Sequence, residues 1–299
     1  MVCVRRAWLD LYGDGTVTLP LESEAGGWYC TELDLGYPEV RDVVNNRPDQ
    51  DGTDDRTRYA AARAVSANIT ARGNQPDALA AQFGPYMIAS VRPVLHYVLD
   101  RPGTPERLLT LRPSGYDWPI NGTRSRDVQL TWVTAGDPYA RDPVARTSTA
   151  WAGSSTTPGR TYNLTFNRIY PPGSGSPVPG IFTPYGDVPA RPLLRVYGPI
   201  TAPWVTIVPA TGPYPYAYTV YFRSGYVINA GAWVDVDTAT KTVFKNSDPT
   251  QPDPGALDWG ASLMFPVLTP NKTWRMTLNG SSTSSVTQVQ AIWSDRWLT

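Results

Sequence analysis

Residues 34–73 read DLGYPEVRDVVNNRPDQDGTDDRTRYAAARAVSANITARG, and the rest of the chain is organised around this stretch. It begins with an extended lead-in over 35–44 that passes from apolar to basic residues. A loop over 45–55 follows, rich in Asn, Asp, Pro and Gly, in which Pro48 and Gly52 are residue types that mark turns. Because burying so many charges without partners is costly, we expect this loop on the surface.

A period-two pattern runs through 59–72 and is typical of a β-strand. Neither face of such a strand would be purely polar. The stretch therefore predicts an extended segment, a polar surface loop and a returning strand. One face of that strand would carry Ala61, Arg63, Val65, Ala67 and Ile69, and the other Ala62, Ala64, Ser66, Asn68 and Thr70.

The composition favours a mainly β chain with many turns. Gly (25) and Pro (30) together make up roughly 18% of the 299 residues, against an average of about 12%, and aromatic residues reach 11%. Glycine and proline are turn residues and aromatic residues favour strands, so short strands joined by turns are expected. The length is sufficient for two domains, each with its own core.

The first half is predicted to contain one helical segment among its strands. Asp77 follows Pro76 and is a candidate N-cap for one kinked helix, or two short helices, ending before Pro93. Three strands are expected within 2–33, with a hairpin turn at 13–15, and further strands at 107–112 and 126–134.

The second half has the rhythm of a β-sandwich, with short aromatic and β-branched segments separated by turns. In the segment AWVDVD, Asp235 and Asp237 are expected to end a strand in a turn at 238–240. A loop rich in Pro, Gly and Ser is predicted at 171–180. The expected strands are 192–200, 203–210, 216–222, 226–237, 241–246, 261–268, 273–280 and 285–295.

Charge and hydropathy argue against nucleic-acid and membrane partners. Lys plus Arg (26) equals Asp plus Glu (26), so no global field attracts nucleic acid or an anionic membrane. No window approaches the ~18 apolar residues of a membrane span. Arg5, Arg6 and Asp10 lie where a signal peptide needs its apolar run. We therefore expect a soluble protein without a cleaved signal.

Residues with catalytic or metal-binding chemistry are sparse. His96 is the only histidine, lies between apolar neighbours, and has no GxSxG nucleophile motif to serve. Cys3 and Cys30 are too few for a zinc site with one histidine; we favour buried free thiols over a bridge between them. An acidic pair for glycoside hydrolysis stays open, because only separation in space decides it. We expect no catalytic site, no metal site and no cofactor.

The acidic loop suggests calcium at first sight. Aligning Gly52 with the glycine of an EF-hand loop places Arg47 at the first ligand position and Arg58 at the position of the bidentate Glu. Cations at both positions exclude an EF-hand, although a calcium site of another type stays open. The alternative is a set of Arg–carboxylate pairs with a neighbouring copy of the chain, or simply a surface loop.

A cluster of aromatic residues in the second half has two interpretations. Stacked aromatic side chains on a β-sheet can form a carbohydrate-binding platform, but core packing explains most of them as well. The candidates for this surface are Trp204, Tyr214, Tyr216, Tyr218 and Tyr221.

The order of these features resembles the distal tail proteins of long-tailed, non-contractile bacteriophages. In the first half, Gly36, Gly52, Arg63 and the segment Asp137 to Tyr139 stand where the family has a glycine, a loop glycine, a basic strand residue and a closing Asp-Pro-Tyr-like segment. In the second half the matching positions are Pro192, Gly198, Pro199, Pro203, Asp237, Thr242 and Val243.

The resemblance implies a structural, non-enzymatic virion protein. Its expected fold is mainly β, with a ring-forming N-terminal domain that contains one helix over 1–142, a linker over 143–160 and a galectin-like β-sandwich over 161–299. The family forms a hexameric hub at the distal tip of the tail, assembled in the host cytoplasm. Its implied partners are itself, the tail tube protein, the tape measure protein, the tail-tip protein and receptor-binding or fibre proteins.

Within this resemblance, the polar loop is the candidate contact between subunits of the ring. The rival interpretation is a carbohydrate- or receptor-binding β-sandwich module that uses the aromatic cluster. The candidate interface residues are Arg41, Arg47, Asp49, Asp51, Gly52, Asp54, Arg56 and Arg58.

Overall fold

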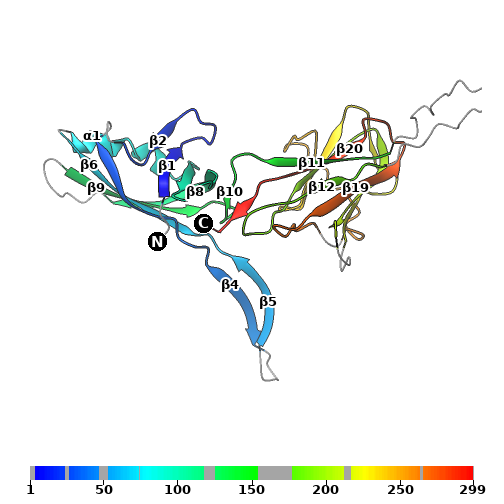
Figure 1. Cartoon of the computed structure of the whole chain (residues 1–299), viewed down its shortest axis with the longest axis horizontal. Coiled ribbons are helices and arrows are strands. Elements are labelled where there is room, and N and C mark those ends of the chain that lie inside the picture. The colour runs from blue at the N-terminus through cyan, green and yellow to red at the C-terminus, as the bar shows by residue number, and fades with distance from the viewer. Residues whose placement is uncertain are drawn as a thin grey trace, which may run out of the picture. The chain divides into compact units, whose positions relative to one another are not determined.

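The structure divides into two compact units that are described separately. It is a computed structural model that describes residues 4–23, 27–46, 53–73, 75–117, 125–153, 177–211, 217–262 and 265–298, with the backbone alone over 40–46 and 53–59. Unit 1 comprises residues 1–143 together with 297–299, and unit 2 comprises 144–296. Both units consist mainly of β-strands, which confirms the predicted fold class (Figure 1).

Unit 1 is built on one large antiparallel sheet. Its main path runs in the order β2-β1-β7-β8-β9-β6-β3, and β10 pairs with β8 and with β21. The strands are β1 Val4–Asp10, β2 Thr18–Pro20, β3 Trp28–Asp34, β6 Ala64–Arg72, β7 Val94–Leu99, β8 Arg107–Asp117, β9 Ser125–Thr134, β10 Ala140–Arg141 and β21 Arg296–Trp297.

The turn between β1 and β2 is held by the side chain at the end of β1. The buried carboxylate of Asp10 accepts hydrogen bonds from the backbone N–H groups of Tyr12, Gly13 and Gly15 at 3.1, 2.9 and 2.6 Å. Three donors on one carboxylate fix the loop and set the register in which Leu9 pairs with Leu19. The predicted hairpin at 13–15 is confirmed.

Strand β6 confirms the returning strand that the period-two pattern predicts; it lies between β9 and β3 and places one face in the core. Val65, Ala67 and Ile69 are at most 1% exposed, and Arg63, just before the strand, is as deeply buried. Around them lies a core drawn from every strand of the main path: Leu9, Leu19, Trp28, Leu95, Tyr97, Leu109, Leu111, Val128, Leu130 and Trp132.

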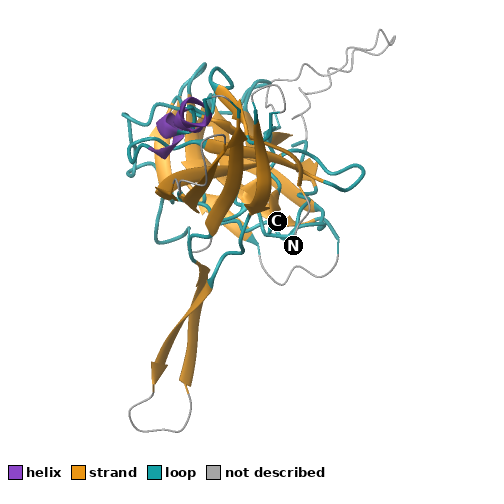
Figure 2. Ribbon diagram, turned by 90° about the vertical axis from the view of Figure 1, so that its left-hand side faces the viewer, coloured by secondary structure: helices purple, strands orange, loops and turns teal. Residues whose placement is uncertain are grey.

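The predicted loop over 45–55 is shorter than expected, because strands extend into it from both sides. β4 Val40–Asn46 and β5 Thr53–Ala60 form an antiparallel two-stranded sheet of their own. Their register pairs Val40 with Ala60 and Asn46 with Thr53, with an irregularity midway. Among the described residues these two strands pair with no other strand, and Figure 2 shows them as a hairpin apart from the sheet.

Two short helices follow β6, in agreement with one of the two predicted alternatives. They are α1 Pro76–Ala81 and the 3-10 helix η1 Gly84–Met87. The predicted N-cap at Asp77 is wrong: the cap position is Gln75, which makes no side-chain cap bond, and Pro76 is the first helical residue. Asp77 lies in the first turn and accepts a hydrogen bond from the Arg126 guanidinium on β9, which lowers the pKa of Asp77.

Unit 2 consists of two antiparallel sheets that share one apolar core. The first has the order β11-β20-β13-β17-β18, and the second the order β12-β19-β14-β15 with β16 beside β14. Leu194, Val234 and Val289 contribute from the first sheet, and Val205 and Met276 from the second. The strands are β11 Arg146–Trp151, β12 Gly180–Phe182, β13 Leu193–Tyr197, β14 Ile200–Pro209, β15 Tyr218–Tyr221, β16 Val227–Ile228, β17 Trp233–Asp237, β18 Thr242–Lys245, β19 Trp274–Ser281 and β20 Gln288–Trp293.

Three expectations for the second half need correction. The expected linker over 143–160 contains β11, whose six residues all pair with β20. The segment 261–268 forms no strand among its described residues; it contributes only a bridge from Leu268 to Ala190. Asp237 accepts turn bonds from Ala239 and Thr240 as expected, whereas Asp235 is buried within β17 because Arg195 pairs with it.

Candidate functional site

The candidate interface residues lie on or between the two strands of the β4–β5 hairpin. Arg41 is on β4, and Asp54, Arg56 and Arg58 are on β5, so the hairpin brings basic and acidic residues onto one two-stranded element. The remaining candidates, Arg47, Asp49, Asp51 and Gly52, lie outside the described residues.

The base of the hairpin is fixed to the core of unit 1. Gly36 has a φ of +57°, and a Cβ atom there would lie 2.2 Å from the backbone oxygen of Ala64, so only glycine fits. Where the chain returns, the Arg63 N–H donates to Thr134 Oγ1 and the Thr134 N–H donates to the Arg63 carbonyl oxygen, both at 3.0 Å. Entry and exit of the hairpin are therefore determined by the fold.

The Arg63 side chain points into the core of unit 1 instead of into the hairpin. It is 1% exposed, and its Nη1 donates to the carbonyl oxygen of Leu298 at 2.7 Å. Burial lowers the pKa of this guanidinium and raises the pKa of Tyr97 beside it. Nε and Nη2 have no hydrogen-bond partner among the described residues. Arg63 thus holds Leu298 in unit 1.

The neighbouring residue Trp297 also contacts the core of unit 1. Its Nε1 donates to Asp142 Oδ1 at 2.9 Å, and the Arg107 guanidinium carbon lies 4.4 Å from the centre of its ring. Asp142 and Arg107 are 8% and 6% exposed, so this contact is largely removed from solvent. No signal in the sequence pointed to these residues.

His96 is part of a structural cluster on β7. Its Nδ1 lies 2.6 Å from Glu106 Oε1, its ring stacks on Trp8 with centroids 5.0 Å apart, and its Nε2 lies 3.8 Å from Asp10 Oδ2. Within the described ranges, no group of three or more His, Cys, Asp or Glu residues is arranged to hold a metal ion.

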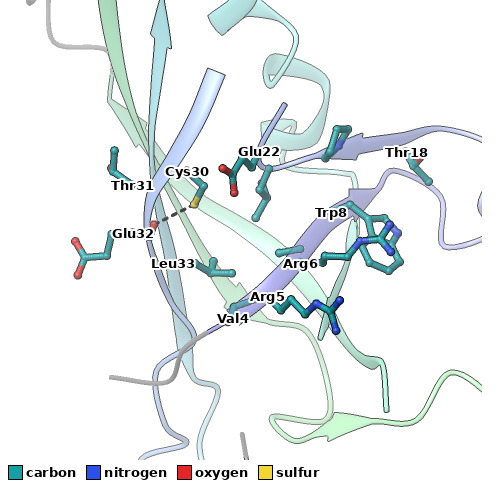
Figure 3. A pocket seen from close by; sticks show the side chains of 13 residues that line it. Val4, Arg5, Arg6, Trp8, Thr18, Glu22, Cys30, Thr31, Glu32 and Leu33 are labelled. Atoms are coloured by element: carbon teal, nitrogen blue, oxygen red, sulfur yellow. Dashed lines mark hydrogen bonds between the residues drawn. The ribbon is translucent and has the colours of Figure 1, made fainter. Parts of the chain in front are cut away.

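A pocket of about 770 Å³ lies between β1 and β2 on one side and β3 on the other (Figure 3). Arg5 and Arg6 line it from β1, and Cys30 and Glu32 line it from β3. The Cys30 thiol donates to the Glu32 carbonyl oxygen at 3.4 Å, and burial raises the pKa of this thiol to about 11. A thiol with so high a pKa is mostly protonated, and therefore a weak nucleophile, at neutral pH. We therefore describe the pocket as a cleft between strands and assign it no chemistry.

The predicted aromatic surface is only partly formed. Trp204 on β14 pairs directly with Tyr221 on β15, and they are 39% and 38% exposed. Tyr218, three residues before Tyr221, faces the other way, is 8% exposed and packs against Trp274 in the core. Its assignment to the surface is therefore wrong. Tyr214 and Tyr216 lie outside the described residues.

The opposite sheet of unit 2 carries an aromatic row that the sequence pattern did not reveal. Trp151, Tyr197 and Trp233 come from strands β11, β13 and β17, and Gln288 on β20 lies between the first two. Period-two alternation within each strand could have placed each ring on the outer face, but only the strand order brings them together.

Among the described residues, no helix is both long enough and apolar enough to cross a membrane. The sequence matches no protein-family model and no curated protein.

Among solved structures, the chain is similar to the Dit protein of phage SPP1, a paradigm of the hub adsorption apparatus in phages that infect Gram-positive bacteria. The identity is 12% and the TM-score 0.55, over 98% of this chain and 99% of that chain. A chain of the phage P2 baseplate in its activated conformation with Ca is 12% identical, with a TM-score of 0.47 over 97% of this chain and 98% of that chain. At this identity, the likeness to SPP1 Dit establishes a shared fold.

Proposed function

We propose that this chain is a structural protein of a phage tail tip, a hub whose copies assemble into a ring. The observation that carries the proposal is the extent of the fold shared with SPP1 Dit, which spans both units of this chain and nearly all of the other chain. A common sandwich alone would say little about function, because one fold serves many roles. A match that spans two successive units is more specific.

The β4–β5 hairpin supports self-association. Two strands without a third are marginally stable in water, and among the described residues this pair finds no further strand. Their free edges are the groups that a neighbouring copy can pair with. Groups that could form charge pairs with that copy are also present, since the hairpin carries both Arg and Asp residues. A head-to-tail contact of this kind generates a closed ring when the rotations between successive copies add up to one full turn about a common axis.

The proposed ring contains six copies and lies at the distal end of the tail. Its partners are the tail tube, tape measure and tail-tip proteins on one side and receptor-binding or fibre proteins on the other. We assign it no enzymatic activity and no cofactor. The net charge of zero suits a ring that DNA must pass, because a strongly cationic channel would retain phosphate.

The test is the oligomeric state of hairpin variants. The wild-type chain should give sixfold rings by mass photometry and negative-stain imaging. Asp51→Ala with Asp54→Ala, and separately replacement of 42–58 by a short Gly-Ser turn, should abolish rings while circular dichroism stays that of a folded β protein.

A matched control removes two aspartates elsewhere. Asp14 and Asp248 hold local turns through Thr16 and Thr250 and lie outside the hairpin, so Asp14→Ala with Asp248→Ala should leave the rings intact. Rings that persist in the hairpin variants, or a wild-type chain that stays monomeric at every concentration, would contradict the proposal.

A further inference from the structure

The outer face of the sheet β11-β20-β13-β17-β18 carries a continuous strip of aromatic and amide side chains. Trp151 pairs directly with Gln288, Gln288 with Tyr197, and Tyr197 with Trp233. Directly opposed residues of antiparallel strands point to the same face. We call these four residues the aromatic–amide strip.

The strip lies on the face of the sheet opposite the core of unit 2. The residues that alternate with it on the same strands, Ala150, Val196, Val234 and Val289, are at most 3% exposed and make up the core face of the sheet. Trp151 is 39% exposed on the other side. Large rings collected on a face that the core does not use indicate a surface that contacts something else.

Two rings of the strip are fixed in position within the chain. The centroids of Tyr197 and Trp233 are 5.9 Å apart with the planes tilted by 41°. Trp233 Nε1 donates to Ser247 Oγ at 3.0 Å, and the Tyr197 hydroxyl donates to Gln290 Oε1 at 3.3 Å. Because these side chains are already held in place, binding of a ligand would cost little side-chain conformational entropy.

The adjacent row of the same face is polar but almost free of net charge. Arg195 forms two hydrogen bonds to the Asp235 carboxylate, at 2.7 and 3.1 Å, and Ser247 donates to the same carboxylate at 2.6 Å. The pair neutralises itself. The neutral members of this row are Thr149, Gln290 and, at its end on β18, Phe244.

This combination fits one class of ligand better than others. A sugar ring presents an apolar C–H face that stacks on an aromatic ring and a rim of hydroxyl groups that bond to amides, which both donate and accept. The four residues of the strip carry no charge. The Arg195 guanidinium, whose carbon lies 5.8 Å from the centre of the Trp233 ring, is paired with Asp235, so an anionic polymer meets no unpaired cation and a basic peptide no unpaired carboxylate there. The strip crosses three strand spacings, about 14 Å, which is the length of a short oligosaccharide.

We propose that the aromatic–amide strip binds a neutral polysaccharide, with Trp151, Tyr197 and Trp233 stacking on sugar rings and Gln288 bonding to hydroxyl groups. The site belongs to unit 2 alone and does not depend on the ring.

The experiment uses the full chain on an array of immobilised neutral and acidic oligosaccharides, followed by calorimetric titration with the neutral glycans that bind. Trp151→Ala and Gln288→Ala should each weaken binding by about tenfold, a typical loss for one buried stacking or hydrogen-bonding group. Trp204→Ala is the matched control, because Trp204 is equally exposed at 39% but lies on the other sheet. Its affinity should equal that of the wild type.

Four outcomes would overturn the proposal: no neutral glycan bound on the array, binding to acidic glycans alone, undiminished binding by both strip variants, or loss of binding in Trp204→Ala. Hydrogen exchange on the wild-type chain adds an independent measurement. Protection of β11 and β20 by the bound glycan supports the site. Protection of these strands in assembled particles without any glycan would be a fifth outcome against the proposal, because a protein partner would then cover the strip.

Discussion

Replacing Trp297 with alanine tests how much the segment at 297–298 contributes to the stability of unit 1. The change removes the hydrogen bond to Asp142 at 2.9 Å and the stacking of the ring under the Arg107 guanidinium at 4.4 Å. It also removes the apolar packing of the indole ring against the core of unit 1.

The magnitude follows from these contacts. A hydrogen bond to a charged group contributes about 1.5–3 kcal/mol, and a largely desolvated cation–π contact about 2 kcal/mol. These two contributions come from one side chain, so they cannot simply be added. Because Trp297 is also only partly buried, we expect Trp297→Ala to reduce the stability of unit 1 by about 3 kcal/mol, the low end of the range for Trp→Ala in cores.

The assay must separate the two units, because a single unfolding curve for two cores is not two-state. Hydrogen exchange followed by mass spectrometry gives the opening free energy of β8 in unit 1 and of β17 in unit 2 within one sample. We expect the loss in β8 and none in β17. Trp297→Phe keeps a ring but lacks the N–H donor, so it should lose about half as much.

Two results would refute this reasoning. A change below about 0.5 kcal/mol in β8 would class Trp297 as an ordinary surface residue. An equal loss in β8 and β17 would mean that the two units unfold together, and the effect would then not report on unit 1.

Three further predictions concern local features of unit 1. Gly36→Ala should destabilise unit 1 by more than about 2 kcal/mol because its Cβ would meet backbone, whereas Gly15→Ala, with φ of +78° and open space, should cost only about 1 kcal/mol; equal thermal shifts would contradict this. The Cys30 thiol, with its pKa raised to about 11 by burial, should be alkylated slowly at pH 8.5 and faster only as the pH rises through 10 to 11, measured on its own peptide by mass spectrometry; a rate equal to that in urea would show the shift to be absent. Asp10→Ala should destabilise unit 1 by about 2 kcal/mol by leaving turn donors without their acceptor, seen as faster exchange of the turn amides; unchanged exchange would assign the turn to its glycines alone.

The sequence was sufficient where structure depends on a local period or a turn residue. The alternation around Val65 and Ala67 correctly predicts a strand and the residues that share each of its faces, because a strand pattern needs no knowledge of the partner strand; which face is buried became clear only in the structure. The turn at Gly13 to Gly15 is also predictable, because glycine readily adopts the positive φ that such turns need.

The sequence was insufficient where a residue distant in the chain determines the local structure. Arg195 keeps Asp235 within a strand, and because the two are forty positions apart, the local pattern around the aspartate predicts a turn instead. The polar residues at 45–46 and 54–55 have low strand propensity, so the sequence predicts a loop where β4 ends and β5 begins. The aromatic–amide strip depends on the order of four strands, which no local pattern contains.

Tyr218 is an instructive case because its position was available from the sequence. Counting back two positions from Tyr221 leads to Thr219 as the residue on the same face, and Tyr218 therefore falls on the opposite face, where the core lies. Position along the strand, and not residue type, decides which tyrosines share a face.

The division of unit 1 into two segments of the chain, with unit 2 between them, has a consequence for synthesis. Trp297 and Leu298 leave the ribosome after the whole of unit 2, so the buried Arg63 cannot form its hydrogen bond to the Leu298 carbonyl oxygen until unit 2 has been synthesised. A chain released before residue 297 would contain a complete unit 2 and an unfinished unit 1. Because the hairpin ends just before Arg63, only chains translated past Leu298 would present it from a finished base to other copies.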